Sequence, residues 1–228
     1  MLEGKNKSLN EQLLVLESIL NKSKKIKEIL RVLEQYSKEN QDFKNYYLAA
    51  GCINQTIFNY YHNYDLDYGI GDYDIVYYDE DTSYEKEDII IKDLKERLKH
   101  LDLKFDIKNE KRVHIWYNEK YKTNRKEYQS VEDAISKWGT TITCLGVRME
   151  NNKLIVCAPY GLNDLFNLIL RPVKIDFTKE DYEKKVTKWT SKWELLKVIR
   201  YEEWGKKYEW KYYRWNYKWN KICEDEWY

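Results

Sequence analysis

The stretch Asp72-Tyr73-Asp74-Ile75-Val76-Tyr77-Tyr78 decides how this sequence can fold. Its β-branched and aromatic residues predict a strand that begins at about Asp72 and is bounded by Gly71 and the acidic turn at residues 79–81. Successive side chains of a strand point to opposite faces, so Asp72 and Asp74 are expected on the same side, roughly 6.5 to 7 Å apart. The strand therefore presents two carboxylates together.

A carboxylate pair at this spacing fits a shared site for divalent metal ions. Hard oxygen ligands favour Mg²⁺ or Mn²⁺. Two such ions about 3.5 to 4 Å apart can activate an attacking oxygen and neutralise a leaving pyrophosphate. A third carboxylate from a neighbouring strand would complete the site, with Asp106 as first candidate and Glu110 in reserve. From spacing alone, a solvated strand end that feeds the acidic turn is the more usual interpretation of D-Y-D.

Amphipathic helices are predicted on the N-terminal side of this strand and directly after it. Apolar residues recur every three or four positions over residues 13–33, and the polar residues 21–23 divide this region into two helices. Another helix follows Gly51. Thr82 and Glu85 make a capping box that predicts a helix to about Lys99.

The remaining segments predict a mixture of strands and short helices. Alternating or β-branched residues indicate strands at 103–107 and 112–117, and a hairpin of 142–149 with 153–158. Helices are predicted at 130–137, capped by Ser130 and Asp133, at 162–170 and at 179–193. The order of elements predicts an α+β fold, a small mixed β-sheet with flanking helices.

Three regions differ in composition. We expect an N-terminal helical segment at residues 1–23, the main domain at 24–199 and an aromatic-basic C-terminal extension at 200–228. The extension interleaves Trp and Tyr with Lys and Arg, so it could stack on single-stranded RNA or form an amphipathic helix that packs on the domain. Helical spacing of Trp204, Tyr208, Trp215 and Trp219 favours packing.

Composition sets the class of protein. The 228 residues carry a net charge of +1, so no global field attracts nucleic acid or a membrane surface. No apolar run is long enough to cross a bilayer, and we expect a soluble cytoplasmic protein with no membrane partner. The four cysteines form no C-x-x-C pair, and reduced thiols are expected.

Several residues outside the strand are candidates for binding phosphate. Gly51, at the start of a helix, offers bare N–H groups and the positive end of the helix dipole, although a simple cap is the commoner role of such a glycine. Arg112, just downstream of Asp106, is the favoured cation among Lys111, Arg112, Arg148 and Arg171. His114 is interpreted as a structural, hydrogen-bonded residue rather than a catalytic one.

Two motifs are more specific in combination than alone: A-A-G-C-I-N at residues 49–54 and D-Y-D-I-V-Y-Y-D at 72–79. Together they resemble the signature of the DNA polymerase beta nucleotidyltransferase superfamily. Three further blocks make the chain similar to a bacterial family of nucleotidyltransferases, namely F-D-I-K-N-E-K-R-V-H-I-W-Y at 105–117, S-V-E-D-A-I-S-K-W at 130–138 and A-P-Y-G-L-N-D-L-F at 158–166. The resemblance covers residues 26–193.

The resemblance implies a polymerase-beta-like fold with Asp72, Asp74 and Asp106 as catalytic metal ligands. The same resemblance places Gly51 near the triphosphate of a nucleoside triphosphate such as ATP, and we assign Gly51, Cys52, Asn54 and Arg112 to the nucleotide site. The superfamily usually has serine where this chain has Cys52, and a thiol is a weaker donor than a hydroxyl.

Two classes of function follow as hypotheses. The first is a metal-dependent transferase that moves a nucleotidyl group from a nucleoside triphosphate to an acceptor and releases pyrophosphate. The sequence leaves the acceptor open among RNA, a protein and a small molecule. The second is a catalytically weak or inactive protein on the same fold, which binds nucleotide or RNA or serves as a subunit of a protein complex.

Overall fold

A five-stranded mixed sheet forms the centre of the computed structural model, which describes residues 2–203. The strands are β1 (Tyr46–Ala49), β2 (Tyr73–Tyr77), β3 (Phe105–Asn109), β4 (Gly146–Glu150) and β5 (Lys153–Cys157), in the order β3-β2-β1-β4-β5. Only β2 and β3 pair in parallel within this sheet, because α4 (Tyr84–Leu98) carries the chain back between them. The predicted α+β class with a mixed sheet is confirmed.

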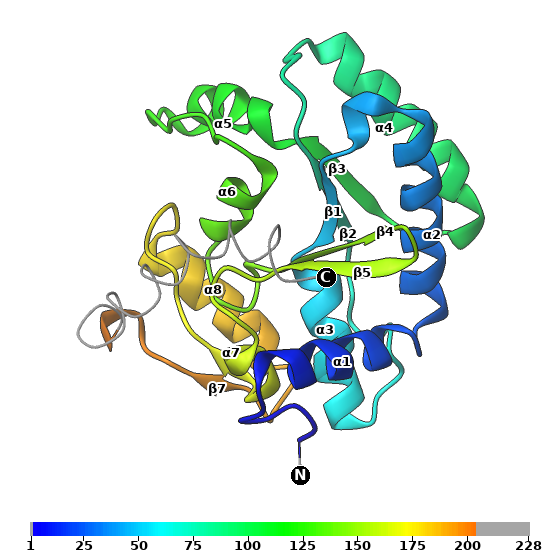
Figure 1. Cartoon of the computed structure of the whole chain (residues 1–228). Coiled ribbons are helices and arrows are strands. Elements are labelled where there is room, and N and C mark those ends of the chain that lie inside the picture. Colours follow the sequence, from blue (N-terminus) through cyan, green and yellow to red (C-terminus); the bar gives the residue numbers. More distant parts are fainter. Residues whose placement is uncertain (1, 204–228) are drawn as a thin grey trace.

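Helices lie on both sides of the sheet (Figure 1). Besides α4, the longer ones are α1 (Leu9–Leu20), α2 (Lys24–Glu39), α3 (Gly51–His62) and α8 (Lys179–Thr190). The shorter ones are α5 (Val113–Tyr121), α6 (Val131–Ser136) and α7 (Asn163–Phe166). In Figure 1, α2 and α4 stand on one side of the sheet, and α5, α6 and α8 stand on the other. A short parallel pair, β6 (Ile169–Leu170) with β7 (Lys197–Val198), lies apart from the main sheet.

Local capping signals set several of these helices. Ser8 and Glu11 form a reciprocal capping box at the start of α1, and Ser23 accepts a hydrogen bond from the Ile26 N–H at the start of α2. The predicted division into two N-terminal helices is therefore confirmed. Buried Leu16 and Ile19 of α1 belong to the same hydrophobic core as α2 and α3.

Alternation along the strands separates a large core from the face that carries the polar site. Tyr73, Ile75 and Tyr77 of β2 are buried in the main core, which includes residues of α1, α2, α3 and α4. Asp74 and Val76 point to the opposite face. There Val76 packs in a smaller cluster whose other buried members are Tyr47, Ala49, Val131, Ile135, Cys144, Cys157 and Val173.

Three predicted segments are wrong in detail. Residues 112–117 form no strand, because Asn109 accepts a hydrogen bond from the Lys111 N–H and turns the chain into a 3-10 turn that continues as α5. The side chain of Thr82 does not cap α4, which follows Ser83. The helix predicted for residues 162–170 is the single turn α7, because Leu168 adopts a left-handed conformation with φ 56° before β6.

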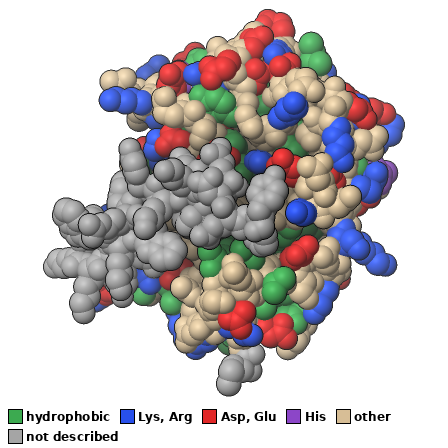
Figure 2. All heavy atoms as spheres, viewed as in Figure 1, with side chains coloured by type: hydrophobic (Ala, Val, Ile, Leu, Met, Phe, Trp, Pro, Cys, Tyr) green, Lys and Arg blue, Asp and Glu red, His purple; other side chains and the backbone are tan. Residues whose placement is uncertain are grey.

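Acidic and basic side chains are interspersed over the described part of the face drawn in Figure 2. Within residues 2–203, no helix is both long and apolar enough to span a bilayer. Cys52 and Cys144 are buried free thiols, and Cys157 is also buried. Cys223 and the aromatic-basic extension from residue 204 onward lie outside the described residues.

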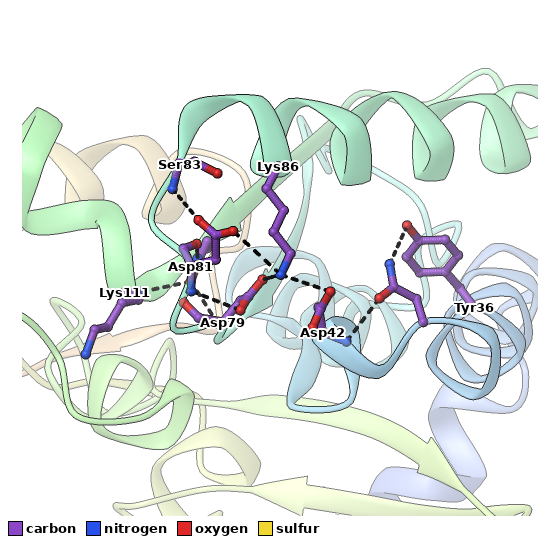
Figure 3. A network of polar contacts seen from close by, with 9 residues as sticks. Tyr36, Asp42, Asp79, Asp81, Ser83, Lys86 and Lys111 are labelled. Atoms are coloured by element: carbon purple, nitrogen blue, oxygen red, sulfur yellow. Dashed lines mark hydrogen bonds and ion pairs between the residues drawn. The ribbon is translucent and has the colours of Figure 1, made fainter.

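Two lysines pair with the acidic turn after β2: Lys86, drawn in Figure 3, and Lys111, whose Nζ lies 3.0 Å from a carboxylate oxygen of Glu80. Lys86 of α4 places its Nζ 2.9 Å from carboxylate oxygens of both Asp79 and Asp42. The Asp81 carboxylate accepts a hydrogen bond from the Ser83 N–H at 2.9 Å. Asp79 and Asp81 lie past the end of β2 that is opposite to Asp72, and Asp42 lies in the 3-10 turn before β1.

Candidate active site

Asp74 of β2 and Asp106 of β3 are direct partners in the parallel register and line one cavity of about 220 Å³. The other charged residues of its wall are Lys108 and Glu110, from the strand and turn that follow Asp106, and Lys185 of α8. The rest of the wall is formed by Ala50, Val76, Trp138 and Thr143. Segments from five regions of the chain therefore form the wall of this cavity.

The carboxylates of this cavity repel one another. Burial, and then the negative charge of Asp72, raise the pKa of Asp74 to about 6, and Asp106 adds to the effect. Burial raises the pKa of Glu110 to about 8, with further contributions from Asp74 and Asp106 that Lys108 opposes. Groups with such displaced pKa values in a cavity are typical of functional sites.

The start of α3 adds a positive backbone end to the same cavity. Ala50, the residue before the helix, has φ 54° and ψ −125° and offers no side chain to cap the first N–H groups. This is a conformation that non-glycine residues rarely adopt, and such strain is concentrated at functional sites. A Cβ added to Gly51 would lie 2.9 Å from the Gln55 Nε2, so the flexible Gln55 amide covers Gly51 and would have to move before a ligand could contact this residue.

None of the four residues assigned to the nucleotide site from the sequence lines this cavity, and Gly51 only follows Ala50, which does. The Cys52 thiol is fully buried and donates to the Ala49 carbonyl oxygen at 3.2 Å, and burial raises its pKa. Asn54 is buried as well, and its Nδ2 donates to the Ile142 carbonyl oxygen at 2.8 Å. The Arg112 guanidinium donates to the Thr82 carbonyl oxygen and pairs with Glu87.

Two further arginine candidates, Arg171 and Arg148, have structural contacts. Arg171 makes a buried bidentate pair with Asp164, at 2.8 and 3.1 Å, which stabilises the segment around α7. Arg148 pairs with Glu150 and lies over the Tyr47 ring. His114, interpreted from the sequence as a hydrogen-bonded structural residue, lies on α5, and within residues 2–203 its buried Nδ1 makes no such hydrogen bond.

Asp72 opens to a second cavity of about 190 Å³ next to the first. Its wall includes Lys104 and two lysines from the last turn of α8 and the residues just after it, Lys188 and Lys192. Gln55, Gly69, Gly71, Trp189 and Trp193 complete the wall. The two carboxylates of the D-Y-D motif thus border two neighbouring cavities, and α8 contributes to both.

Sequence reasoning missed Lys108 and Lys185. Lys108 lies two residues after Asp106, so the alternation of β3 places both on one face, and this signal was available in the sequence. Its Nζ contacts the Asp106 carboxylate. Nothing local marks Lys185, which reaches the cavity only because α8 packs there; burial lowers its pKa, and Asp74 opposes that shift.

Within residues 2–203, no group of three His, Cys, Asp or Glu side chains is arranged so that it could hold a metal ion. Asp106 is paired with Lys108, and Asp72 lies 3.6 Å from the Lys104 Nζ. The donor chemistry nevertheless fits a hard divalent cation, because Asp74 carries a charge that burial and its acidic neighbours disfavour. A divalent cation would relieve that repulsion.

Comparison with known proteins gives two similarities over most of the chain. A family model described as "Nucleotidyltransferase" matches residues 37–198. A solved structure described as revealing "a CCA-adding enzyme head domain" is similar with a TM-score of 0.64 and 26% identity, over 86% of this chain and 98% of that chain. No curated protein matched in the comparison.

Proposed function

The chain belongs to the nucleotidyltransferase family, and on this premise we propose that it transfers a nucleotidyl group from a nucleoside triphosphate to an acceptor with the help of Mg²⁺ or Mn²⁺. One observation carries the proposal: Asp74 faces Asp106 across two parallel strands, in a cavity that adjoins the uncapped start of α3. Acidic side chains for a metal and N–H groups for a phosphate are thereby brought together.

The reaction divides into roles for individual residues. An acceptor oxygen forms a bond to the α-phosphorus, the bond from that phosphorus to the bridging oxygen breaks, and pyrophosphate leaves with the electron pair. Asp72, Asp74 and Asp106 would hold the metal, which when bound supplies charge neutralisation and makes the acceptor oxygen easier to deprotonate. Asp106 is our candidate for accepting the acceptor proton. The first N–H groups of α3 bind a phosphate oxygen.

The test is Mg²⁺-dependent binding of each nucleoside triphosphate, measured by calorimetry. We expect the wild type to bind and a folded Asp72→Asn/Asp74→Asn protein to lose that binding and all turnover. Asp81→Asn is the matched control, because Asp81 follows the same strand but lies in the turn of Figure 3. Binding or turnover that survives in the double variant would exclude this site.

A binding protein without chemistry is the second candidate, and one contact favours it. The Cys52 thiol donates into the core, so the side chain at this position offers no donor to a phosphate. On this view the wild type binds nucleoside triphosphate with Mg²⁺ but forms no pyrophosphate with RNA, protein or small-molecule acceptors. Cys52→Ser is the informative variant: a gain of pyrophosphate release would favour the enzyme.

A further inference from the structure

The two cavities beside the D-Y-D motif differ in charge. The first has three acids, Asp74, Asp106 and Glu110, against two lysines, a formal charge of −1 when all three acids are ionised, which a bound cation would favour. The second has one acid, Asp72, against Lys104, Lys188 and Lys192, a formal charge of +2. The first cavity is therefore suited to a cation, and the second to the most highly charged part of an anion.

Helix α8 and the residues just after it present lysines to both cavities. Lys185, Lys188 and Lys192 follow one another at intervals of three and four residues, which places them on one side of a helical path. Lys185 borders the first cavity, and the other two border the second. A chain of phosphates that began beside Asp74 and continued past Asp72 would meet these ammonium groups in turn.

Among the three lysines of the second cavity, Lys188 is the one without a competing partner in residues 2–203. In the described part of the chain, no carboxylate or hydrogen-bond acceptor contacts its ammonium group, whereas the Nζ of Lys184 on the same helix lies 2.7 Å from Glu180. The Lys192 Nζ donates to the Gly69 carbonyl oxygen at 3.1 Å, and Lys104 lies 3.6 Å from Asp72. The charge of Lys188 is thus available to a ligand.

The walls of the second cavity are held in place by buried contacts. Trp193 is fully buried, and its indole N–H donates to the Asn59 Oδ1 at 2.7 Å. The Asn59 amide in turn donates to the Leu66 and Tyr68 carbonyl oxygens, which fixes the loop before Gly69. A Cβ added to Gly71 would meet nothing within 4 Å, so the backbone on that side is open.

We propose that the second cavity is a pyrophosphate site, which binds the β- and γ-phosphates of the donor and the pyrophosphate released from it, through Lys188 with help from Lys104 and Lys192. The proposal rests on the proposed function for its ligand, and on the charge and position of the cavity for its location. Asp74 borders the first cavity and Asp72, two residues earlier on the same face, borders the second, so an extended triphosphate can run from one cavity toward the other.

The experiment is calorimetry of the full chain with inorganic pyrophosphate in the presence of Mg²⁺. Lys188→Gln should weaken pyrophosphate binding about tenfold or more, because a charge-assisted contact is lost. Lys184→Gln is the matched control, since it removes one lysine of the same helix outside the cavity, and its affinity should stay within about twofold. Equal affinities in the wild type and Lys188→Gln, or no binding of pyrophosphate by the wild type, would overturn the site.

Competition separates the donor from other sources of phosphate. We expect pyrophosphate to displace bound nucleoside triphosphate; simultaneous binding of both would mean that the cavity takes a phosphate of the acceptor, and would overturn the assignment. Binding of pyrophosphate that depends on Lys188, without binding of any nucleoside triphosphate, would support the site while the proposed function failed. If Lys188→Gln binds pyrophosphate and nucleoside triphosphate as tightly as the wild type does, the proposed function is unaffected but the assignment of the second cavity as a pyrophosphate site is wrong.

Discussion

Asp74 and Asp106 lie opposite one another across the parallel pairing of β2 and β3, so their carboxylates share one face of the sheet and one cavity. In the absence of a divalent cation this arrangement is unfavourable, because burial and neighbouring negative charge both oppose ionisation of Asp74. The ionised acidic pair therefore destabilises the metal-free protein. Its presence is explained if the pair binds a metal ion for the proposed nucleotidyl transfer.

The first prediction is that Asp74→Asn stabilises the metal-free protein above pH 6. The folded pKa of Asp74 is about 6 against an ordinary value of 3.8, so the wild type loses stability as the pH rises through that range. The full difference corresponds to about 3 kcal/mol. Urea unfolding in a chelator at pH 5 and pH 8 measures it. A variant whose advantage does not grow with pH would contradict the prediction; Asp72→Asn, at a half-exposed site, should change stability less.

The second prediction concerns Glu110, whose pKa burial raises to about 8 from an ordinary value of 4.5. Its contribution to stability is present below pH 4.5 and is lost as the pH rises through about 8, because the folded state binds the proton more tightly. In NMR spectra, the chemical shift of the Glu110 side-chain carboxyl carbon should change with a midpoint near pH 8. This signal should be missing from the spectrum of Glu110→Gln. Titration near pH 4.5 in the wild type would show that the group is solvated. Exposed Glu183→Gln is the control for assignment.

The third prediction is that Ala50→Gly stabilises the protein by about 1 kcal/mol. Strain at the φ and ψ of Ala50 costs on the order of 1 to 3 kcal/mol, and the added freedom of glycine in the unfolded chain offsets part of the gain. Thermal unfolding of Ala50→Gly and Ala49→Gly gives the comparison. Ala49 is buried in β1, and glycine there should destabilise. Destabilisation by both variants to the same extent would show that Ala50 carries no strain.

The fourth prediction is that Asn59→Ala lowers the free energy of unfolding by about 2 to 4 kcal/mol. The buried Asn59 amide joins the Trp193 indole to two backbone carbonyl oxygens, and its loss leaves those groups without their partner. Denaturant unfolding measures the effect. Asn167→Ala, which removes an exposed hydrogen bond, should cost less than about 1 kcal/mol. If Asn59→Ala and Asn167→Ala lower the free energy of unfolding equally, Asn59 does not have the structural role assigned to it.

Much of the fold is predictable because its signals act over a few residues. The alternating and β-branched residues of β2, the polar break between α1 and α2, and the Ser130 cap of α6 each determine their element from neighbouring side chains. The segment at residues 112–117 shows the limit. Its aromatic and β-branched composition favours a strand, but the Asn109 turn begins a helix on which Ile115 and Trp116 stay exposed.

The candidate site divides in the same way. The sequence by itself determined that Asp72 and Asp74 share a face, because alternation is a property of the strand, and it indicated Gly51 at a helix start. Only the tertiary structure decided that Asp106 is the partner of Asp74, that Cys52 and Asn54 point into the core, and that Lys185 and Lys188 reach the cavities. The physical reason is that burial and charge at this site come from segments distant in sequence, whose approach is set by packing of the whole sheet and its helices.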